Sequence, residues 1–99
     1  MPAYVIVDVD LRDASALGDY MERVPALIRQ FGGRYLARGG KAETLEGDWQ
    51  PHRIVIVEFP SAEQAKRFHQ SPEYKPYKDA RLAAGTSDMI VVEGLEKPL

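Results

Sequence analysis

The sequence predicts an α+β fold built from one antiparallel sheet and two helices. Two amphipathic stretches, with apolar residues at helical spacing, alternate with four short runs rich in β-branched residues. The four runs are Tyr4–Val9, Arg34–Arg38, Arg53–Phe59 and Met89–Glu93. Their β-α-β-β-α-β order is that of a ferredoxin-like sandwich, in which two helices cover one face of a four-stranded antiparallel sheet.

Length and composition narrow the class of protein. At 99 residues the chain is expected to form one domain, residues 1–99. The net charge is −2 and acids and bases are interspersed, which argues against nucleic-acid binding. The chain has no cysteine, which excludes disulfides and thiol chemistry. Neither a membrane-spanning apolar run nor a signal-peptide pattern is visible, so we expect a cytoplasmic protein that does not bind membranes.

The first half of the chain reads as strand, helix and strand. In Tyr4–Val9 the side chains alternate between two apolar faces. Asp13 or Ser15 can cap the helix that follows. The apolar residues at helical spacing are Leu17, Tyr20, Met21, Val24, Leu27, Ile28 and Phe31. Pro25 lies among them and removes the backbone bond to Met21, so we expect a kinked but continuous helix.

The second half repeats this pattern with more interruptions. Gly39-Gly40 should end or bulge the second strand, and Lys41–Glu46 can continue as a bent strand or ribbon. A capping box at Ser61–Gln64 opens the second helix. Pro76 is awkward within that helix, so a last helical segment is expected to start there and run to Ala84, before the final strand.

The sheet is predicted to be apolar on both faces. Two helices cover one face, yet Ile6, Ile54 and Ile56 are expected on the other. Exposed apolar patches of this kind usually mark an interface. The simplest partner is a second copy of the chain, which predicts a homodimer through the helix-free face.

Several strings of the sequence together resemble a known family. They are Ala3–Val9, Gly33–Gly40, Leu45–Trp49, Val57–Ser61 and Ser71–Tyr74. The chain resembles the bacterial domain-of-unknown-function family 1330, from which it departs at Pro76. The resemblance implies a dimeric α/β barrel of ferredoxin-like subunits and brings no reaction with it. The wider superfamily includes small monooxygenases, isomerases, haem-degrading enzymes and dehydratases, and members with no known activity.

Three charged residues are the candidate catalytic groups. Asp8, Arg38 and Glu58 each stand on a predicted strand among aliphatic neighbours, and we expect all three on the helix-free face. A charge buried there needs a counter-charge, so Arg38 is expected to pair with Asp8 or Glu58, within one subunit or across the dimer. The group could serve as a carboxylate base and an arginine that binds an anionic oxygen, or simply as a structural ion pair.

Two aromatic residues are candidate ligand-binding groups. Tyr4 lies on the first strand, and Trp49 lies in a Gly-Asp-Trp-Gln-Pro loop. Each can equally be a packing element. His52 and His69 lack the clustered spacing of a metal site, and His69 alone is weak evidence for haem, so no metal and no cofactor are expected.

Two functions remain open from the sequence. The first is a cofactor-independent enzyme acting on a small apolar substrate by proton transfer or oxygenation. The second is a structural or ligand-binding dimer without catalytic activity. An enzyme should contain a closed pocket with convergent polar groups, whereas a structural dimer should hold Arg38 fully satisfied and lack such a pocket.

Overall fold

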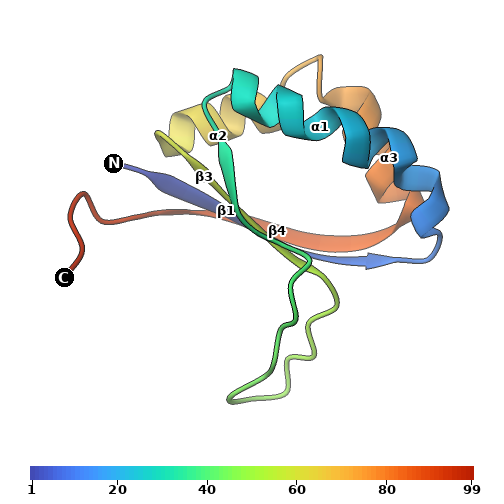
Figure 1. The fold of residues 1–99 in the computed structure, drawn as a ribbon, viewed down its shortest axis with the longest axis horizontal. Helices are drawn as coiled ribbons and strands as arrows, with labels where there is room; N and C mark the ends of the chain where they lie inside the picture. The colour runs from blue at the N-terminus through green and yellow to red at the C-terminus, as the bar shows by residue number, and fades with distance from the viewer.

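A four-stranded antiparallel sheet forms the base of the protein, as a computed structural model of residues 1–99 shows (Figure 1). All residues are described except the side chain of Ala14. The strands are β1 (Ala3–Leu11), β2 (Arg34–Arg38), β3 (Ile54–Phe59) and β4 (Gly85–Glu93). Their order across the sheet is β2-β3-β1-β4, which confirms the predicted ferredoxin-like topology.

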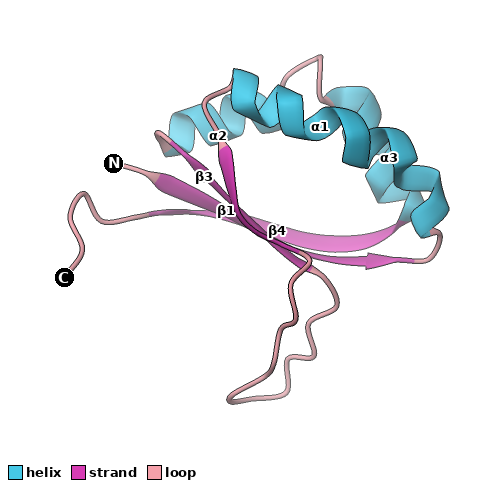
Figure 2. Cartoon of the chain, viewed as in Figure 1, coloured by secondary structure: helices cyan, strands magenta, loops and turns pink.

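The helices lie on one face of this sheet (Figure 2). They are α1 (Gly18–Gln30), α2 (Ala62–His69) and α3 (Lys75–Ala84), and a 3-10 turn, η1 (Ala14–Leu17), precedes α1. The second predicted helix is thus divided in two, with Pro76 in the first turn of α3 as expected. None of the helices in the described chain is long and apolar enough to cross a membrane.

Helix α1 continues through Pro25, as predicted. Its buried residues Val24 and Ile28 lie on either side of the proline in the sequence and pack into one core cluster with Phe59. Burial of this shared face holds the two halves of the helix together, although the proline nitrogen cannot donate to the Met21 carbonyl.

Strand β2 contains a bulge that changes the direction of its last residues. Tyr35 pairs with Val57, but Ala37 pairs with Ile56, so Leu36 is an extra residue. Gly39-Gly40 directly follow the last residue of the strand, in agreement with the expectation that they end it, whereas the bulge lies at Leu36. Because side chains alternate along a strand, the extra residue turns Arg38 toward the helices.

The segment between β2 and β3 is a long exposed loop. The bent strand or ribbon allowed for Lys41–Glu46 is not formed. Figure 1 shows this loop projecting from the sheet on the side opposite the helices. The loop therefore lies beside the helix-free face.

The two faces of the sheet differ in how well they are covered. Val7, Val57 and Phe59 face the helices and are buried. On the helix-free face Ile6 lies opposite both Ile56 and Ile90, and Ile90 is 60% exposed. An open apolar face therefore runs across the sheet, as the alternation predicts.

Strand β4 begins four residues before the predicted start, at Gly85. A side chain at Gly85 would overlap the carbonyl oxygen of Asp10 on the neighbouring strand. Glycine at this position lets α3 pass directly into the sheet, which brings Arg81 of α3 close to Ser87 of β4.

Candidate functional site

The structure separates the three predicted catalytic residues. Asp8 and Glu58 lie on the helix-free face, on neighbouring strands. Glu58 pairs with Arg34, whose Nε lies 2.6 Å from the Glu58 Oε2. Arg38 lies on the opposite face because of the bulge at Leu36. The predicted pairing of Arg38 with Asp8 or Glu58 within one subunit is therefore wrong.

Arg38 instead supports helix α1. Its guanidinium donates to the Met21 carbonyl oxygen at 3.1 Å and lies 5.2 Å from the centre of the Tyr35 ring. That carbonyl is the one that Pro25 leaves without a helical donor. Arg38 thus compensates for the backbone bond that the proline removes.

Asp8 anchors the loop between β2 and β3. Its carboxylate accepts from the Trp49 Nε1 at 3.0 Å, from the His52 backbone N–H at 2.9 Å and from the Arg53 backbone N–H at 3.2 Å. Burial alone would raise the pKa of Asp8, but these donors and the nearby His52 imidazole lower it. The carboxylate therefore stays ionised at neutral pH.

The predicted aromatic residues lie at two ends of the helix-free face. Trp49 is 61% exposed and contacts Asp8, so the structure brings these two together. Tyr4 lies opposite Glu58 in the register of β1 and β3, and its ring lies beside Gly94. Neither aromatic residue lines the cavity that lies between the sheet and the helices.

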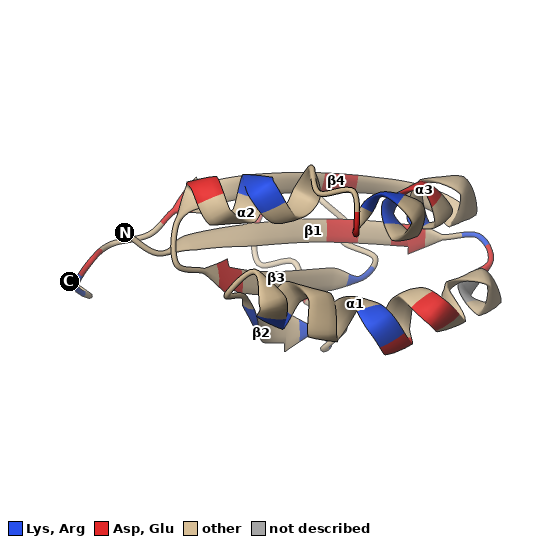
Figure 3. Ribbon diagram, turned by 90° about the horizontal axis from the view of Figure 1, so that it is seen from above, with Lys and Arg blue, Asp and Glu red and all other residues tan. Residues whose placement is uncertain are grey.

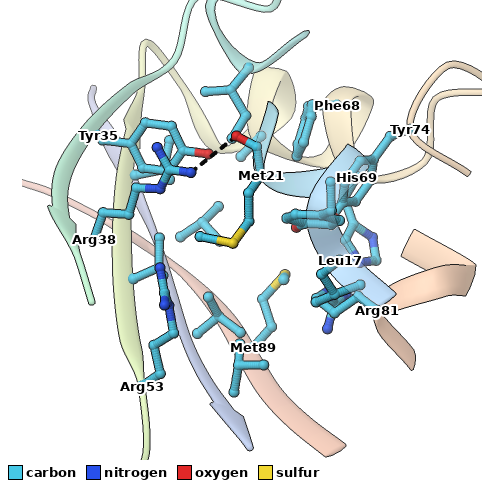
Figure 4. Close-up of a pocket in the computed structure, with 18 of the residues that line it drawn as sticks. Leu17, Met21, Tyr35, Arg38, Arg53, Phe68, His69, Tyr74, Arg81 and Met89 are labelled. Atoms are coloured by element: carbon cyan, nitrogen blue, oxygen red, sulfur yellow. Dashed lines mark hydrogen bonds between the residues drawn. The ribbon is translucent and has the colours of Figure 1, made fainter. Parts of the chain in front are cut away.

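A cavity of about 120 Å³ lies between the sheet and the helices (Figure 4). Most of its wall is aliphatic or aromatic. The apolar lining residues are Val5, Val7, Val9, Leu11, Leu17, Met21, Ile28, Val55, Val57, Phe59, Ala65, Phe68 and Met89. Met21 of α1 and Met89 of β4 extend into it from opposite walls (Figure 4). Such a lining favours a small apolar occupant.

Two tyrosines form a polar pair in the cavity wall. The hydroxyl oxygens of Tyr20 and Tyr74 lie 2.6 Å apart, and the rings meet edge to face. Burial, followed by repulsion from Tyr74, raises the pKa of Tyr20 far above the usual value for tyrosine. The pKa of Tyr35, also in the wall, is raised by burial. Tyr20 and Tyr35 therefore remain neutral hydroxyl groups.

Three arginines line the same cavity. Arg38 and Arg53 approach it from the β2–β3 edge, and Arg81 from α3 on the opposite side (Figure 4). Arg81 is only 5% exposed and donates to the Ser87 hydroxyl. Among the described side chains, no aspartate or glutamate lines the cavity. This concentration of positive charge occurs in a chain whose net charge is −2 and whose acidic and basic residues are otherwise interspersed along the ribbon (Figure 3).

His69 completes the polar part of the wall. Burial lowers its pKa, and the charges of Lys78 and Arg81 lower it further. The imidazole is therefore neutral at pH 7, with one nitrogen able to donate and one able to accept. The described residues contain no group of three or more His, Cys, Asp or Glu side chains that could hold a metal ion.

Sequence reasoning missed most of this polar group. The helical periodicity indicates only that Tyr20 is a core residue. His69 has no metal-ligating neighbour in the sequence and is by itself weak evidence for haem binding. Arg81 belongs to no recognisable motif, yet it follows Tyr74 and Tyr77 at helical spacing and therefore stands on the buried stripe of α3. An arginine within an otherwise apolar helical stripe is the sequence feature that could have indicated this site.

The comparisons with known proteins place the chain in a family. The family described as Domain of unknown function (DUF1330) matches residues 2–95. The chain belongs to this family. Among curated protein sequences, none matches the chain significantly.

Solved structures share the fold. RPA0582 of Rhodopseudomonas palustris, a protein of unknown function, is similar with a TM-score of 0.76 and 23% identity over 97% of this chain and 84% of that one. SnoaB of Streptomyces nogalater, a cofactor-independent oxygenase, gives a TM-score of 0.64 and 13% identity over 97% of this chain and 95% of that one.

A third similar structure is a dimeric ferredoxin-like protein of unknown function from Jannaschia sp. CCS1. Its TM-score is 0.63, with 12% identity over 95% of this chain and 100% of that one. At these identities the likeness establishes the ferredoxin-like fold alone.

Proposed function

We propose that this DUF1330 protein is a homodimer that binds a small, largely apolar molecule in the cavity between its sheet and its helices. The observation that carries the proposal is the cavity itself, whose apolar wall is interrupted by a few converging polar groups. Those groups include the Tyr20–Tyr74 pair and Arg81. They would fix the orientation of a bound molecule, while the apolar wall supplies affinity.

The proposed dimer joins the helix-free faces of two copies. Ile6, Ile56 and Ile90 leave an apolar surface there that burial against an identical surface would stabilise. A protein of this fold, from Jannaschia, is dimeric. This arrangement leaves the cavity, which lies on the other side of the sheet, free to bind.

Cofactor-independent chemistry is the second candidate function. Its support is the neutral imidazole of His69 in the cavity wall, which can accept a proton from a bound molecule. SnoaB, which shares the fold, is a cofactor-independent oxygenase. A catalytic role for Asp8 and Glu58 would require a separate site between two helix-free faces, because neither lines the cavity.

The methionines provide a direct test of cavity binding. The chain has three, of which Met21 and Met89 line the cavity, whereas Met1 does not. Toluene added to protein labelled with ¹³C at the methionine methyls should shift the Met21 and Met89 signals and leave Met1 unchanged. Saturation of these shifts would give the affinity.

A pair of variants controls this titration. Met21→Trp should occupy part of the cavity with a larger side chain and weaken toluene binding, whereas Leu82→Trp, on the exposed face of α3, should not. The absence of saturable shifts at Met21 and Met89, or equal binding by both variants, would rule out the proposed site.

A further inference from the structure

We propose that the molecule bound in this cavity is a small apolar carboxylate whose charged group sits on Arg81. This inference rests on the proposed function and names the class of ligand. It begins from an arginine that is buried without a counter-ion.

Arg81 carries an unsatisfied charge. Its side chain is almost wholly buried, and its Nε finds no hydrogen-bond partner among the described atoms. One terminal nitrogen donates to the neutral Ser87 hydroxyl. Guanidinium groups stay protonated in proteins, and a buried cation is costly unless it is paired. An anion that enters the cavity would remove this cost.

The chain's own acids near α3 are committed elsewhere. Asp79 pairs with Lys75, and Asp13 accepts from Ser15 at the start of η1. Asp88 neighbours Ser87 on β4 but stands opposite Asp8, on the helix-free side. Tyr20 cannot supply a phenolate at neutral pH, because its pKa is raised. No ion pair joins Arg81 to an acid of the described residues, so an anion that pairs with it would come from outside the chain.

The groups beside Arg81 suit a carboxylate. Tyr20 and Tyr74 share one hydrogen bond between two hydroxyl groups, so one O–H of the pair remains free to donate. The neutral imidazole of His69 offers one further donor. A carboxylate has two oxygens that accept several hydrogen bonds, and it matches the planar guanidinium.

The rest of the cavity limits the size of the molecule. Its volume of about 120 Å³ is close to the roughly 150 Å³ of an apolar cavity that holds one benzene ring. Arg38 and Arg53 at the opposite side add positive charge, which would attract anions toward the site. A carboxylate that carries one ring or a short branched chain fits this volume and has the negative charge that the arginines would attract.

The test compares benzoate with benzyl alcohol, a neutral molecule of similar size, in the methionine-methyl titration. A hydrogen-bonded charge pair should make benzoate bind roughly 10- to 100-fold more tightly than benzyl alcohol. Arg81→Leu should abolish this preference. Arg23→Leu removes the same charge from an exposed site outside the cavity, and this variant should retain the preference for benzoate.

The outcomes separate the two proposals. If toluene binds but benzoate and benzyl alcohol bind equally, the carboxylate inference is overturned and the proposed function stands. If none of the three binds, both fail. If Arg81→Leu does not fold, the ratio of the benzoate and benzyl alcohol affinities in the natural chain still tests the inference. The charge-retaining Arg81→Lys variant then serves as the second test, and it is expected to keep a preference for benzoate.

Discussion

At the scale of single residues, Asp8 shows how a carboxylate on an apolar sheet can organise a loop. Its side chain, only 11% exposed, collects donors from Trp49, His52 and Arg53 at the point where the long loop returns to β3. Two of these donors are backbone N–H groups that would otherwise lack partners. Asp8 thus links β1 to a loop that lies far along the chain.

Removal of this carboxylate should release the loop. We expect Asp8→Ala to lower the free energy of unfolding by about 1–2 kcal/mol and to change the fluorescence of Trp49, the single tryptophan. Asp48→Ala, an exposed acid of the same loop, should change neither. Unchanged fluorescence in Asp8→Ala would show that the loop is held by other contacts.

Acid should act in the same direction as this substitution. Because the pKa of Asp8 is lowered in the folded protein, its stabilisation is complete above the ordinary aspartate value of 3.8 and is lost as the pH falls through the lower, folded value. The ¹³C signal of the Asp8 side-chain carboxyl should therefore titrate with a midpoint below 3.8. A midpoint at or above 3.8 would contradict the assigned pKa direction.

At the scale of secondary-structure elements, α1 and β2 depend on each other. Pro25 leaves the Met21 carbonyl without its helical donor, and Arg38 of β2 supplies one. The contact exists because the bulge at Leu36 turns Arg38 toward the helix layer. A local defect in one element is therefore compensated by an irregularity in another.

A double-mutant cycle can measure this dependence. Arg38→Ala should lower the free energy of unfolding by about 0.5–1 kcal/mol in the natural sequence, since the carbonyl loses its donor. In a Pro25→Ala background the cost should shrink, because the alanine restores a backbone N–H that takes over the bond. Urea denaturation gives both values. Arg23→Ala serves as the control and should cost the same in either background; additive effects for Arg38 would refute the coupling.

At the scale of the whole molecule, the two faces of the sheet have different proposed roles. The helix-covered face encloses the cavity, and the helix-free face is the one proposed to join two copies. Because the roles lie on opposite sides, assembly and ligand binding should be separable by mutation. Ile56 on the helix-free face offers a position for this test.

Ile56→Lys should break the dimer, because it would bury an unpaired charge in the interface. Sedimentation of the natural chain should give twice the chain mass of 11.1 kDa, and the variant should sediment as single chains. Ile56→Leu should remain dimeric. A natural chain that is monomeric at micromolar concentration would refute the assembly, and loss of toluene binding in a folded Ile56→Lys monomer would show that the cavity needs the partner.

The sequence by itself determined the order of strands and helices, because side-chain periodicity and the positions of proline and glycine act locally. Alternation along Tyr4–Val9 predicted both sheet faces, the stripe around Pro25 predicted a continuous helix, and Pro76 predicted the start of the last one. These inferences need only neighbours in the chain.

Only the tertiary structure decided which polar groups meet. The extra residue at Leu36 reverses every later side chain of β2, so Arg38 left the predicted group of charges. Arg81 gained its significance from the packing of α3 against β4, which buries it beside Ser87 in the wall of the cavity that the tyrosine pair also lines. Register and burial arise from contacts between residues far apart in the sequence, and for that reason local patterns could predict the scaffold but could not locate the cavity.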